Sequence, residues 1–288
     1  MKYAYYPGCS LETSAKEYDL SIREVFKKLG IELVELEDWS CCGSTPGHMT
    51  SELLSASLSL RNSQLAAGMG LELVVPCVAC LARIRYATET MRREPEFAKK
   101  VMKVLNVTNM KEVNTRHPLE IFLNEYGLEK IEPMVERKLN GLKVAPYYGC
   151  LLVRPPEVMK FDDPENPTSL DDLCRIVGAV PIEWQSKMEC CGAILALSSP
   201  DIQIDFSLSI LEKAKIAGAD IIVLACPLCH SNLETTEVTK KVNMPVLYYS
   251  QLLGIGLGIS AKSLGLERNL ISPFEVLSDY LRKEEVIE

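Results

Sequence analysis

The sequence contains no long hydrophobic run. None of its segments approaches the roughly 18 consecutive apolar residues that a membrane-spanning helix needs. The first residues, up to Cys9, also lack the apolar segment of a secretory signal. We therefore expect a protein without a membrane span that works in the reducing cytoplasm, where structural disulfides are rare.

Positive charge is also scarce. The 31 Lys and Arg residues are outnumbered by 39 Asp and Glu residues, which gives a net charge of −8 at pH 7. Nucleic-acid binding requires clustered Lys and Arg that neutralise phosphates, so we expect no nucleic-acid partner. The C-x₂-C-x₂-C-x₃-C run of ferredoxins is absent as well, which argues against a simple electron carrier of that type.

Cysteine, by contrast, is abundant and follows a repeated pattern. A single cysteine, a Cys-Cys-Gly segment and a Cys-x-x-Cys segment occur in this order twice, with 34 residues between the cysteine pair and the Cys-x-x-Cys segment each time. The first cysteine set consists of Cys9, Cys41, Cys42, Cys77 and Cys80, and the second of Cys150, Cys190, Cys191, Cys226 and Cys229. The repeat predicts two pseudo-symmetric domains of ordinary size, 1–138 and 139–288, with one set in each.

Apolar segments and segments with helical spacing alternate in both halves. Strands are predicted over 2–6, 31–36, 71–75, 142–148, 179–183 and 221–224, and helices over 14–29, 51–67, 169–177 and 201–217. This alternation predicts an α/β fold in which each domain has a small, mostly parallel sheet covered by helices. Loops at the carboxyl ends of such strands bind ligands, and here they carry Cys9, Cys77, Cys150 and Cys226.

Three further segments are rich in glycine or proline. Residues 41–47 and 154–167 are predicted to be loops, the second of them exposed, because their composition breaks both helices and strands. Residues 254–258 carry three glycines and are predicted to be a loop or a close-packed segment. They lack the preceding strand of a phosphate-binding motif.

The residues around the cysteines suit a bulky inorganic group. Adjacent cysteines reach one point only from a loop, because successive side chains of a strand face opposite ways. Gly43 and Gly192 fit such loops, since glycine tolerates unusual backbone angles and leaves room for a cofactor. The two cysteines of a Cys-x-x-Cys segment share one face at the first turn of a helix, where free N–H groups stabilise negative charge. Pro227 fits the first helical position.

The number of thiols in each set leaves the ligand open. Tetrahedral zinc and an ordinary [4Fe–4S] cubane each take four ligands, so the fifth thiol is spare, redox-active or bound to an unusual cluster. A zinc-stabilised scaffold is one alternative, although zinc sites use more closely spaced cysteines. Disulfides are disfavoured by the odd total of 11 cysteines and by the expected reducing compartment.

The doubled C-x₃₁₋₃₉-CC-x₃₄-CxxC arrangement, with a glycine after each cysteine pair, resembles the CCG domain. A chain with two copies closely resembles the family of heterodisulfide reductase B subunits, over the span from Cys9 to Cys229 and at ten matched cysteines. The resemblance implies one noncubane [4Fe–4S] cluster in each domain, bound by all five cysteines of a set. In that family the two clusters face a shared cavity and reduce a mixed disulfide, which in methanogens is that of coenzyme M and coenzyme B.

The resemblance also implies partner subunits. In the family, electrons come from an iron–sulfur subunit of the C type, which a flavin-containing subunit of the A type supplies. An alternative function is that of an electron-transfer subunit without its own substrate, like the CCG-bearing subunits of lactate, glycolate or thiol-linked fumarate redox complexes. Those proteins commonly carry ferredoxin-type cysteine runs, and their absence here favours the disulfide-reducing function.

A few other polar side chains are candidates for a role at the cysteines. His48 and His230 lie near cysteines in the sequence and are candidate proton donors, and Lys187 is a further candidate catalytic side chain. Lys187, Arg83 and Arg85 are also candidates for contact with an anionic substrate or with the clusters. The plainer interpretation, which also applies to His117, is that these residues are hydrogen-bonded or solvated without a role in chemistry.

Two other features are expected to be structural. Cys174 lies outside the repeat at an apolar helical position, so it is predicted to be a buried and inert thiol. The tyrosine pairs at 5–6 and 147–148, which precede the first cysteine of each set, are predicted to serve aromatic packing at the strand ends.

Overall fold

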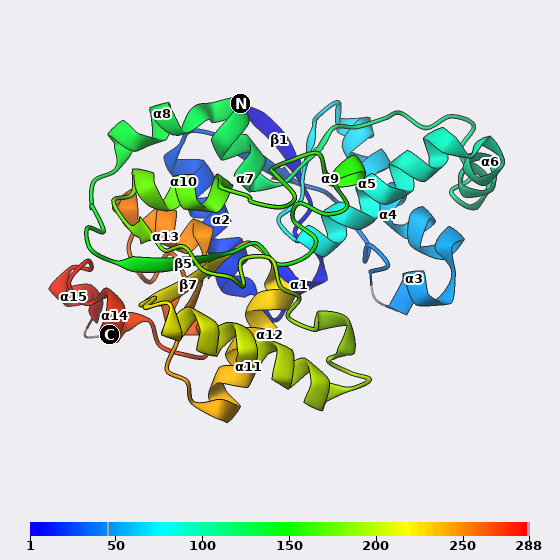
Figure 1. Ribbon diagram of the computed structural model, residues 1–288. Helices are drawn as coiled ribbons and strands as arrows, with labels where there is room; N and C mark the ends of the chain where they lie inside the picture. Colours follow the sequence, from blue (N-terminus) through cyan, green and yellow to red (C-terminus); the bar gives the residue numbers. More distant parts are fainter. Residues whose placement is uncertain (45, 287–288) are drawn as a thin grey trace.

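Each half of the chain forms one parallel sheet, and the two sheets share their strand order. The computed structural model describes residues 1–44 and 46–286. Within them, the order is β2-β1-β3-β4 in the first sheet and β6-β5-β7-β8 in the second, with parallel pairing throughout. The predicted α/β class with two pseudo-symmetric domains is confirmed (Figure 1).

The strands are short, and one strand in each half was not predicted from the sequence. Their bounds are β1 (Lys2–Tyr5), β2 (Glu32–Glu35), β3 (Leu73–Val74), β4 (Thr115–Arg116), β5 (Lys143–Tyr147), β6 (Val180–Pro181), β7 (Ile221–Leu224) and β8 (Val246–Tyr248). The sequence did not predict β4 and β8, because two or three residues are too few to show a period. Both are the edge strands beside the strands that lead to the Cys-x-x-Cys segments.

Helices cover both sheets. In the first half they are α1 (Gly8–Glu12), α2 (Lys16–Lys28), α3 (Pro46–Thr50), α4 (Glu52–Met69), α5 (Val78–Arg93), α6 (Pro95–Val104), α7 (Pro118–Glu120), a π-helical segment (Ile121–Gly127) and α8 (Leu128–Ile131). In the second half they are α9 (Pro156–Met159), α10 (Ser169–Ile176), α11 (Pro200–Ile216), α12 (Pro227–Lys240), α13 (Tyr249–Gly256), α14 (Phe274–Leu277) and α15 (Lys283–Val286). Local sequence explains their ends: Ser51 caps α4 by accepting a hydrogen bond from the Leu54 N–H, and Gly70 ends it in the left-handed conformation.

Three predicted loops differ from the structure. The segment 254–258 begins inside helix α13, where Gly254 packs against Leu264 and Gly256 against Val177, so close packing is confirmed and a loop is wrong for Gly254 and Gly256. The predicted loop 41–47 ends at Pro46, where α3 begins, and its residue Thr45 lies outside the described residues. The predicted exposed loop 154–167 contains α9, whose Met159 is buried.

Cys9 was also expected on a loop, and it lies in the short helix α1 instead. Gly8 takes a positive φ of 72° at the end of the strand, and this conformation lets the chain turn at once into a helix. The cysteine still follows the carboxyl end of β1, as predicted, because the turn occupies only Tyr6 to Gly8.

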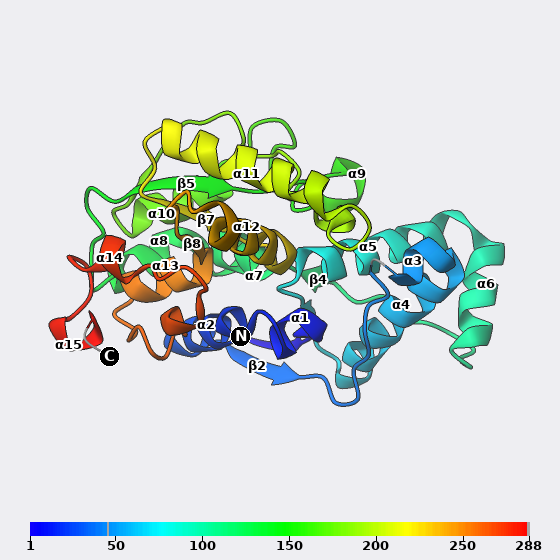
Figure 2. The same cartoon turned by 90° about the horizontal axis from the view of Figure 1, so that it is seen from below.

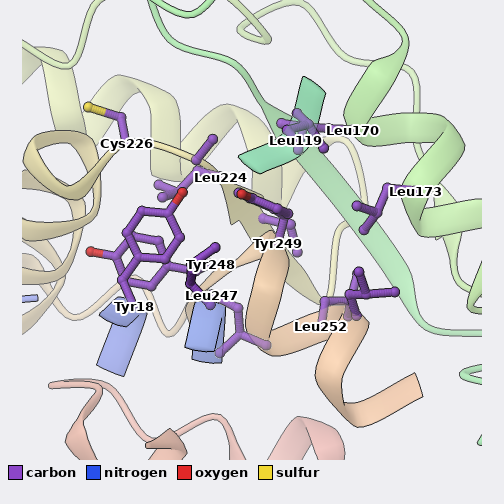
Figure 3. Close-up of a cluster of buried hydrophobic side chains, with 14 of the residues drawn as sticks. Tyr18, Leu119, Leu170, Leu173, Leu224, Cys226, Leu247, Tyr248, Tyr249 and Leu252 are labelled. Atoms are coloured by element: carbon purple, nitrogen blue, oxygen red, sulfur yellow. The ribbon is translucent and has the colours of Figure 1, made fainter. Parts of the chain in front are cut away.

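One hydrophobic core runs through both halves, and a smaller one lies apart from it. The main core includes strands of both sheets, and helix α2 of the first half packs against α13 of the second, where Tyr18 stacks on Tyr248 (Figure 3). Helices α3 to α6 extend to one side of the molecule (Figures 1 and 2), and α4, α5 and α6 enclose the smaller core around Leu60 and Val101. The predicted boundary at 138/139 falls between the two sheets, and its position stays a prediction.

Within residues 1–44 and 46–286, no helix has the length and hydrophobicity that crossing a bilayer requires.

Candidate metal centres

The two cysteine sets occupy corresponding places at the carboxyl ends of the sheets. In the first half Cys9 follows β1 and Cys77 follows β3, and in the second half Cys150 follows β5 and Cys226 follows β7. All the cysteines are free thiols. Each set combines three buried thiols with two that are partly or fully exposed; the buried ones are Cys42, Cys77 and Cys80 in the first set and Cys191, Cys226 and Cys229 in the second.

The thiols of the second set lie against one another. The Sγ atoms of Cys191 and Cys229 are 3.4 Å apart. The pKa of Cys190 is lowered to about 6, chiefly by a hydrogen bond from Cys150. The backbone N–H groups of Gly192 and Ala193 make smaller contributions in the same direction. The Gly192 nitrogen lies 3.4 Å from the Cys190 sulfur. The second Cys-Cys-Gly segment therefore supplies a thiolate at Cys190 and the backbone donors that stabilise it.

The first set shows the same coupling. Hydrogen bonds from Cys41 and Cys80, together with the Ser44 N–H, lower the pKa of Cys42 to about 3. Cys80 also interacts with Cys77, and its pKa is raised well above the usual thiol value. A hydrogen bond with Cys42 raises the pKa of Cys41, and the charge of Cys9 raises it further, so each of the five thiols interacts with at least one other thiol of the set.

The Cys-x-x-Cys segments begin helices, as the sequence predicts. Cys77 and Cys226 are the N-cap residues of α5 and α12, both with extended backbone angles. Pro227 occupies the first turn of α12, where its missing N–H leaves no partner unsatisfied. A hydrogen bond from Cys229, and then the N–H groups of Cys229 and Leu228, lower the pKa of Cys226. The helix start thus presents donors to sulfur.

Glycines make room for these sulfurs. A Cβ atom on Gly8 would lie 3.2 Å from the Cys80 sulfur, and a Cβ on Gly149 would lie 3.2 Å from the Cys229 sulfur. Gly43 and Gly192 have φ values of 74° and 75°, which favour glycine. Their Cβ atoms would lie 3.1 and 3.0 Å from backbone atoms of α4 and α11. The backbone therefore requires glycine after each cysteine pair, and a direct role in holding a cofactor stays a prediction.

A tyrosine hydroxyl donates a hydrogen bond to the backbone just before each cysteine pair. The Tyr6 hydroxyl donates to the Ser40 carbonyl at 2.8 Å, and the Tyr147 hydroxyl donates to the Glu189 carbonyl at 2.7 Å. Both carbonyls belong to the residue just before a cysteine pair. Sequence reasoning assigned these tyrosines to packing and missed the hydrogen bonds, for which the only signal was their matching position before each Gly-Cys.

The candidate proton donors lie in very different surroundings. His48 is partly buried, its Nδ1 has no hydrogen-bond partner among the described residues, and burial lowers its pKa. His230 is buried with Nε2 3.2 Å from the Val246 carbonyl, and burial lowers its pKa to about 3. Lys187 is buried and its ammonium is 2.9 Å from an Asp171 carboxylate oxygen. The roles of His48 and His230 as proton donors, and of Lys187 as a catalytic side chain, stay predictions.

The other candidate cations also have partners. Arg85 donates to the Glu120 carboxylate at 2.8 Å, and Arg83 lies over the Tyr86 ring at 5.9 Å. His117 is buried with Nε2 2.8 Å from the Pro76 carbonyl. Cys174 is fully buried in α10, and burial raises the pKa of its thiol, as expected for an inert cysteine.

The donor chemistry of the two sets fits iron–sulfur ligation. Five cysteine thiols in each set, glycines beside sulfur atoms and backbone N–H groups near sulfur are features that cysteine-bound iron–sulfur groups use. Within the described part of the chain, no group of three or more His, Cys, Asp or Glu side chains is arranged to hold a metal ion. The two cysteine sets therefore fit an iron–sulfur group by the kind and number of their donors.

The cysteine-rich domain and the fold of this chain both occur in known proteins. The family model of the CCG cysteine-rich domain matches the chain twice, over residues 3–85 and 144–234. A crystal structure of a hypothetical protein from Helicobacter pylori resembles the fold with a TM-score of 0.71 at 13% identity, over 94% of this chain. The chain spans about half of that structure, 52% of its length, so the likeness concerns the fold alone.

Curated relatives extend over almost the entire chain. The 8-methylmenaquinol:fumarate reductase membrane anchor subunit of Wolinella succinogenes is 31% identical and covers 94% of this chain and 97% of its own length. The B subunit of the ferredoxin/F420H2-dependent CoB-CoM heterodisulfide reductase of Methanosarcina acetivorans is 32% identical over 96% of both chains. A protein of Archaeoglobus profundus, described as like the B subunit of heterodisulfide reductase, is 30% identical over 92% of this chain and 93% of its own. The chain is therefore a member of the CCG cysteine-rich domain family, with two copies of the domain, and is related to redox-complex subunits.

Proposed function

We propose that the chain is the disulfide-reducing subunit of a cytoplasmic reductase complex of the heterodisulfide reductase type. The observation that carries the proposal is the matched pair of five-thiol sites, which two sheets of identical strand order place at corresponding strand ends. The proposed substrate is a mixed disulfide of the coenzyme M–coenzyme B type, which is reduced to two thiols.

The proposed cofactors are two noncubane [4Fe–4S] clusters, one on each cysteine set. Bound there, they would supply one electron from each half, and disulfide reduction requires two. The protein's own part is to hold five thiolates per site, to stabilise their charge with N–H groups such as that of Gly192, and to keep the Cys-Cys-Gly loops fixed through Tyr6 and Tyr147. Electrons are proposed to come from an iron–sulfur subunit of the C type and a flavin subunit of the A type.

Metal analysis tests the cofactor proposal. Anaerobic purification followed by iron and sulfide determination should give about four irons per cysteine set. A colourless protein with zinc and without iron would overturn the proposal and support the zinc scaffold.

A second function is favoured by one observation. The fumarate reductase subunit from Wolinella succinogenes aligns with this chain over 97% of its own length. A subunit of another redox complex therefore has the same extent as this chain, and electron transfer within such a complex is the second candidate function. The iron-loaded protein should therefore be reduced with a chemical donor and offered a panel of disulfides. Release of two thiols per disulfide supports the first function, and reduced protein that leaves every disulfide intact supports the second.

A further inference from the structure

The hydroxyl of Tyr248 is buried without a hydrogen-bond partner. The side chain is 0% exposed, and its oxygen has no partner among the described residues. Buried hydroxyl groups are nearly always paired, because an unpaired one loses its bonds to water and gains nothing in return. Tyr249, the next residue, shares both properties and offers a matched comparison.

Tyr248 lies within reach of the charge of one cysteine from each set, Cys226 and Cys77. Strand β8 ends at Tyr248 and pairs it with Leu224 of β7, two residues before Cys226. The Tyr18 ring stacks on Tyr248 at 4.0 Å and 3°, as seen beside Cys226 in Figure 3. The His230 ring stacks on it at 4.2 Å and 20°. Two rings cannot share one face at these distances, so Tyr248 is held between them.

The neighbours of this three-ring stack belong to both cysteine sets. His230 directly follows Cys229 of the second set. The Tyr18 hydroxyl donates to the Pro76 carbonyl at 3.4 Å, and Pro76 directly precedes Cys77 of the first set. The stack therefore connects the helix start of one site to the helix start of the other and fixes the Tyr248 ring between them.

The phenol of Tyr248 stays protonated chiefly because it is buried. Burial raises its pKa well above the usual value, and the charges of Glu17, Cys226, Glu234 and Cys77 raise it further. The His230 ring faces the same two carboxyls, with Nδ1 3.9 Å from Glu17 and 3.6 Å from Glu234. A protonated phenol in these surroundings is a hydrogen-bond donor, and thiolate or sulfide sulfur is an acceptor available to it.

We propose that the Tyr248 hydroxyl donates a hydrogen bond to a sulfur atom of the iron–sulfur group held at Cys77 or Cys226, and so helps to set its reduction potential. The inference rests on the proposed iron–sulfur sites and not on disulfide reduction. A donor to sulfur stabilises the more negative, reduced state, so it raises the reduction potential.

Replacement of the hydroxyl alone tests this role. Tyr248→Phe keeps the ring stack, and Tyr249→Phe removes the neighbouring buried hydroxyl, whose surroundings are Tyr18 and the Leu119 backbone rather than a cysteine. In anaerobically loaded protein, a redox titration followed by electron paramagnetic resonance should show a lower reduction potential in Tyr248→Phe and an unchanged one in Tyr249→Phe. Unchanged potentials in Tyr248→Phe, or equal shifts in both variants, would overturn the proposal.

A second measurement applies if Tyr248→Phe fails to bind iron. Fluorotyrosine at position 248 keeps the ring and the hydroxyl but makes the phenol a stronger donor, so the reduction potential should rise. An unchanged or lower potential in that protein contradicts the hydrogen bond. Failure of the proposed function appears differently, as iron-loaded protein that releases thiols from no disulfide, and the potentials of such protein still test Tyr248.

Discussion

The two halves hold their cysteines alike but support the strand end before the first cysteine differently. In the first half Tyr5 donates to Asp19 at 2.8 Å, and Asp19 pairs with Arg23, whose side chain is 34% exposed. In the second half Tyr148 donates to Asp171 at 2.6 Å, and Asp171 pairs with Lys187, whose side chain is 9% exposed. The halves share the placement of their cysteines and the hydrogen bonds from Tyr6 and Tyr147 to the cysteine-pair loops, whereas the supporting ion pairs have diverged.

The divergence has a consequence for the second half. The Lys187 carbonyl accepts the backbone N–H groups of Tyr148 and Gly149, at 2.7 and 3.2 Å. Lys187 therefore joins the strand end before Cys150 to the segment before Cys190, through its main chain and its buried ammonium. Arg23 instead bridges Asp19 to Glu35 on β2, away from the cysteine pair. The second site depends more on a single buried ion pair.

Cysteine replacement should give the largest effect and should be equal in the two halves. Cys41→Ser and Cys190→Ser each remove one exposed thiol of a cysteine pair, so each is expected to lose about half of the bound iron. Disulfide reduction should be abolished in both, because one electron donor does not complete a two-electron reaction. Iron analysis and a thiol-release assay measure these effects, and a normal rate in either variant contradicts the need for two sites.

Removal of the supporting cations should separate the halves. Lys187→Met leaves the buried Asp171 carboxylate without its counter-ion, which is expected to cost about 3–5 kcal/mol of unfolding free energy. Arg23→Met removes a partly exposed partner and leaves Asp19 with a second cation, Lys16 at 3.3 Å, so it is expected to cost about 1 kcal/mol or less. Denaturant unfolding of the two variants at equal metal content measures the difference. Equal losses would show that the second half does not depend on its buried pair as described.

The contact between the halves should respond to pH. Burial raises the pKa of Glu17 on α2 and of Glu234 on α12 to about 7, from an ordinary value of 4.5. Arg268 opposes the shift at Glu17, and the buried His230 lies against both carboxyls. Because the folded pKa is the higher one, the stabilisation is complete below about pH 4.5 and is lost as the pH rises through about 7.

Matched amide variants isolate this contribution. Glu17→Gln and Glu234→Gln should each flatten the fall in stability between pH 4.5 and 7 relative to the unmodified protein, whereas the titration of His230 remains in all three proteins. Unfolding at a series of pH values measures the slopes. A slope that stays the same in both variants would show that these carboxyls do not titrate as their burial implies.

The smallest expected effect concerns Tyr6 and Tyr147, whose hydroxyls donate to the backbone before the cysteine pairs. Tyr6→Phe and Tyr147→Phe each remove one hydrogen bond to a carbonyl, which should cost about 1 kcal/mol. The loss should be the same in both halves, since the geometry is the same. Unfolding free energies and iron content of the two variants provide the measurement, and a marked inequality would limit the pseudo-symmetry to the backbone.

The sequence predicted features that are local and missed those that depend on contacts between distant residues. The helix starts at Cys77 and Cys226 were predictable, because i and i+3 share a helical face. The hydrogen bond from Tyr6 to Ser40 was not, since it joins residues 34 positions apart and leaves no pattern. The helix at Gly254 was mistaken for a possible loop because glycine favours loops, whereas tight contact with Leu264 selects glycine there.

The contact between α2 and α13 also bears on how the protein is made. The hydroxyls of Ser21 and Ser250 are 2.7 Å apart although 229 positions separate them in the chain. While the ribosome synthesises the second half, the face of α2 that α13 will cover stays open to solvent. The first half can therefore complete its core only when nearly the whole chain has emerged, which places final closure of the molecule after translation.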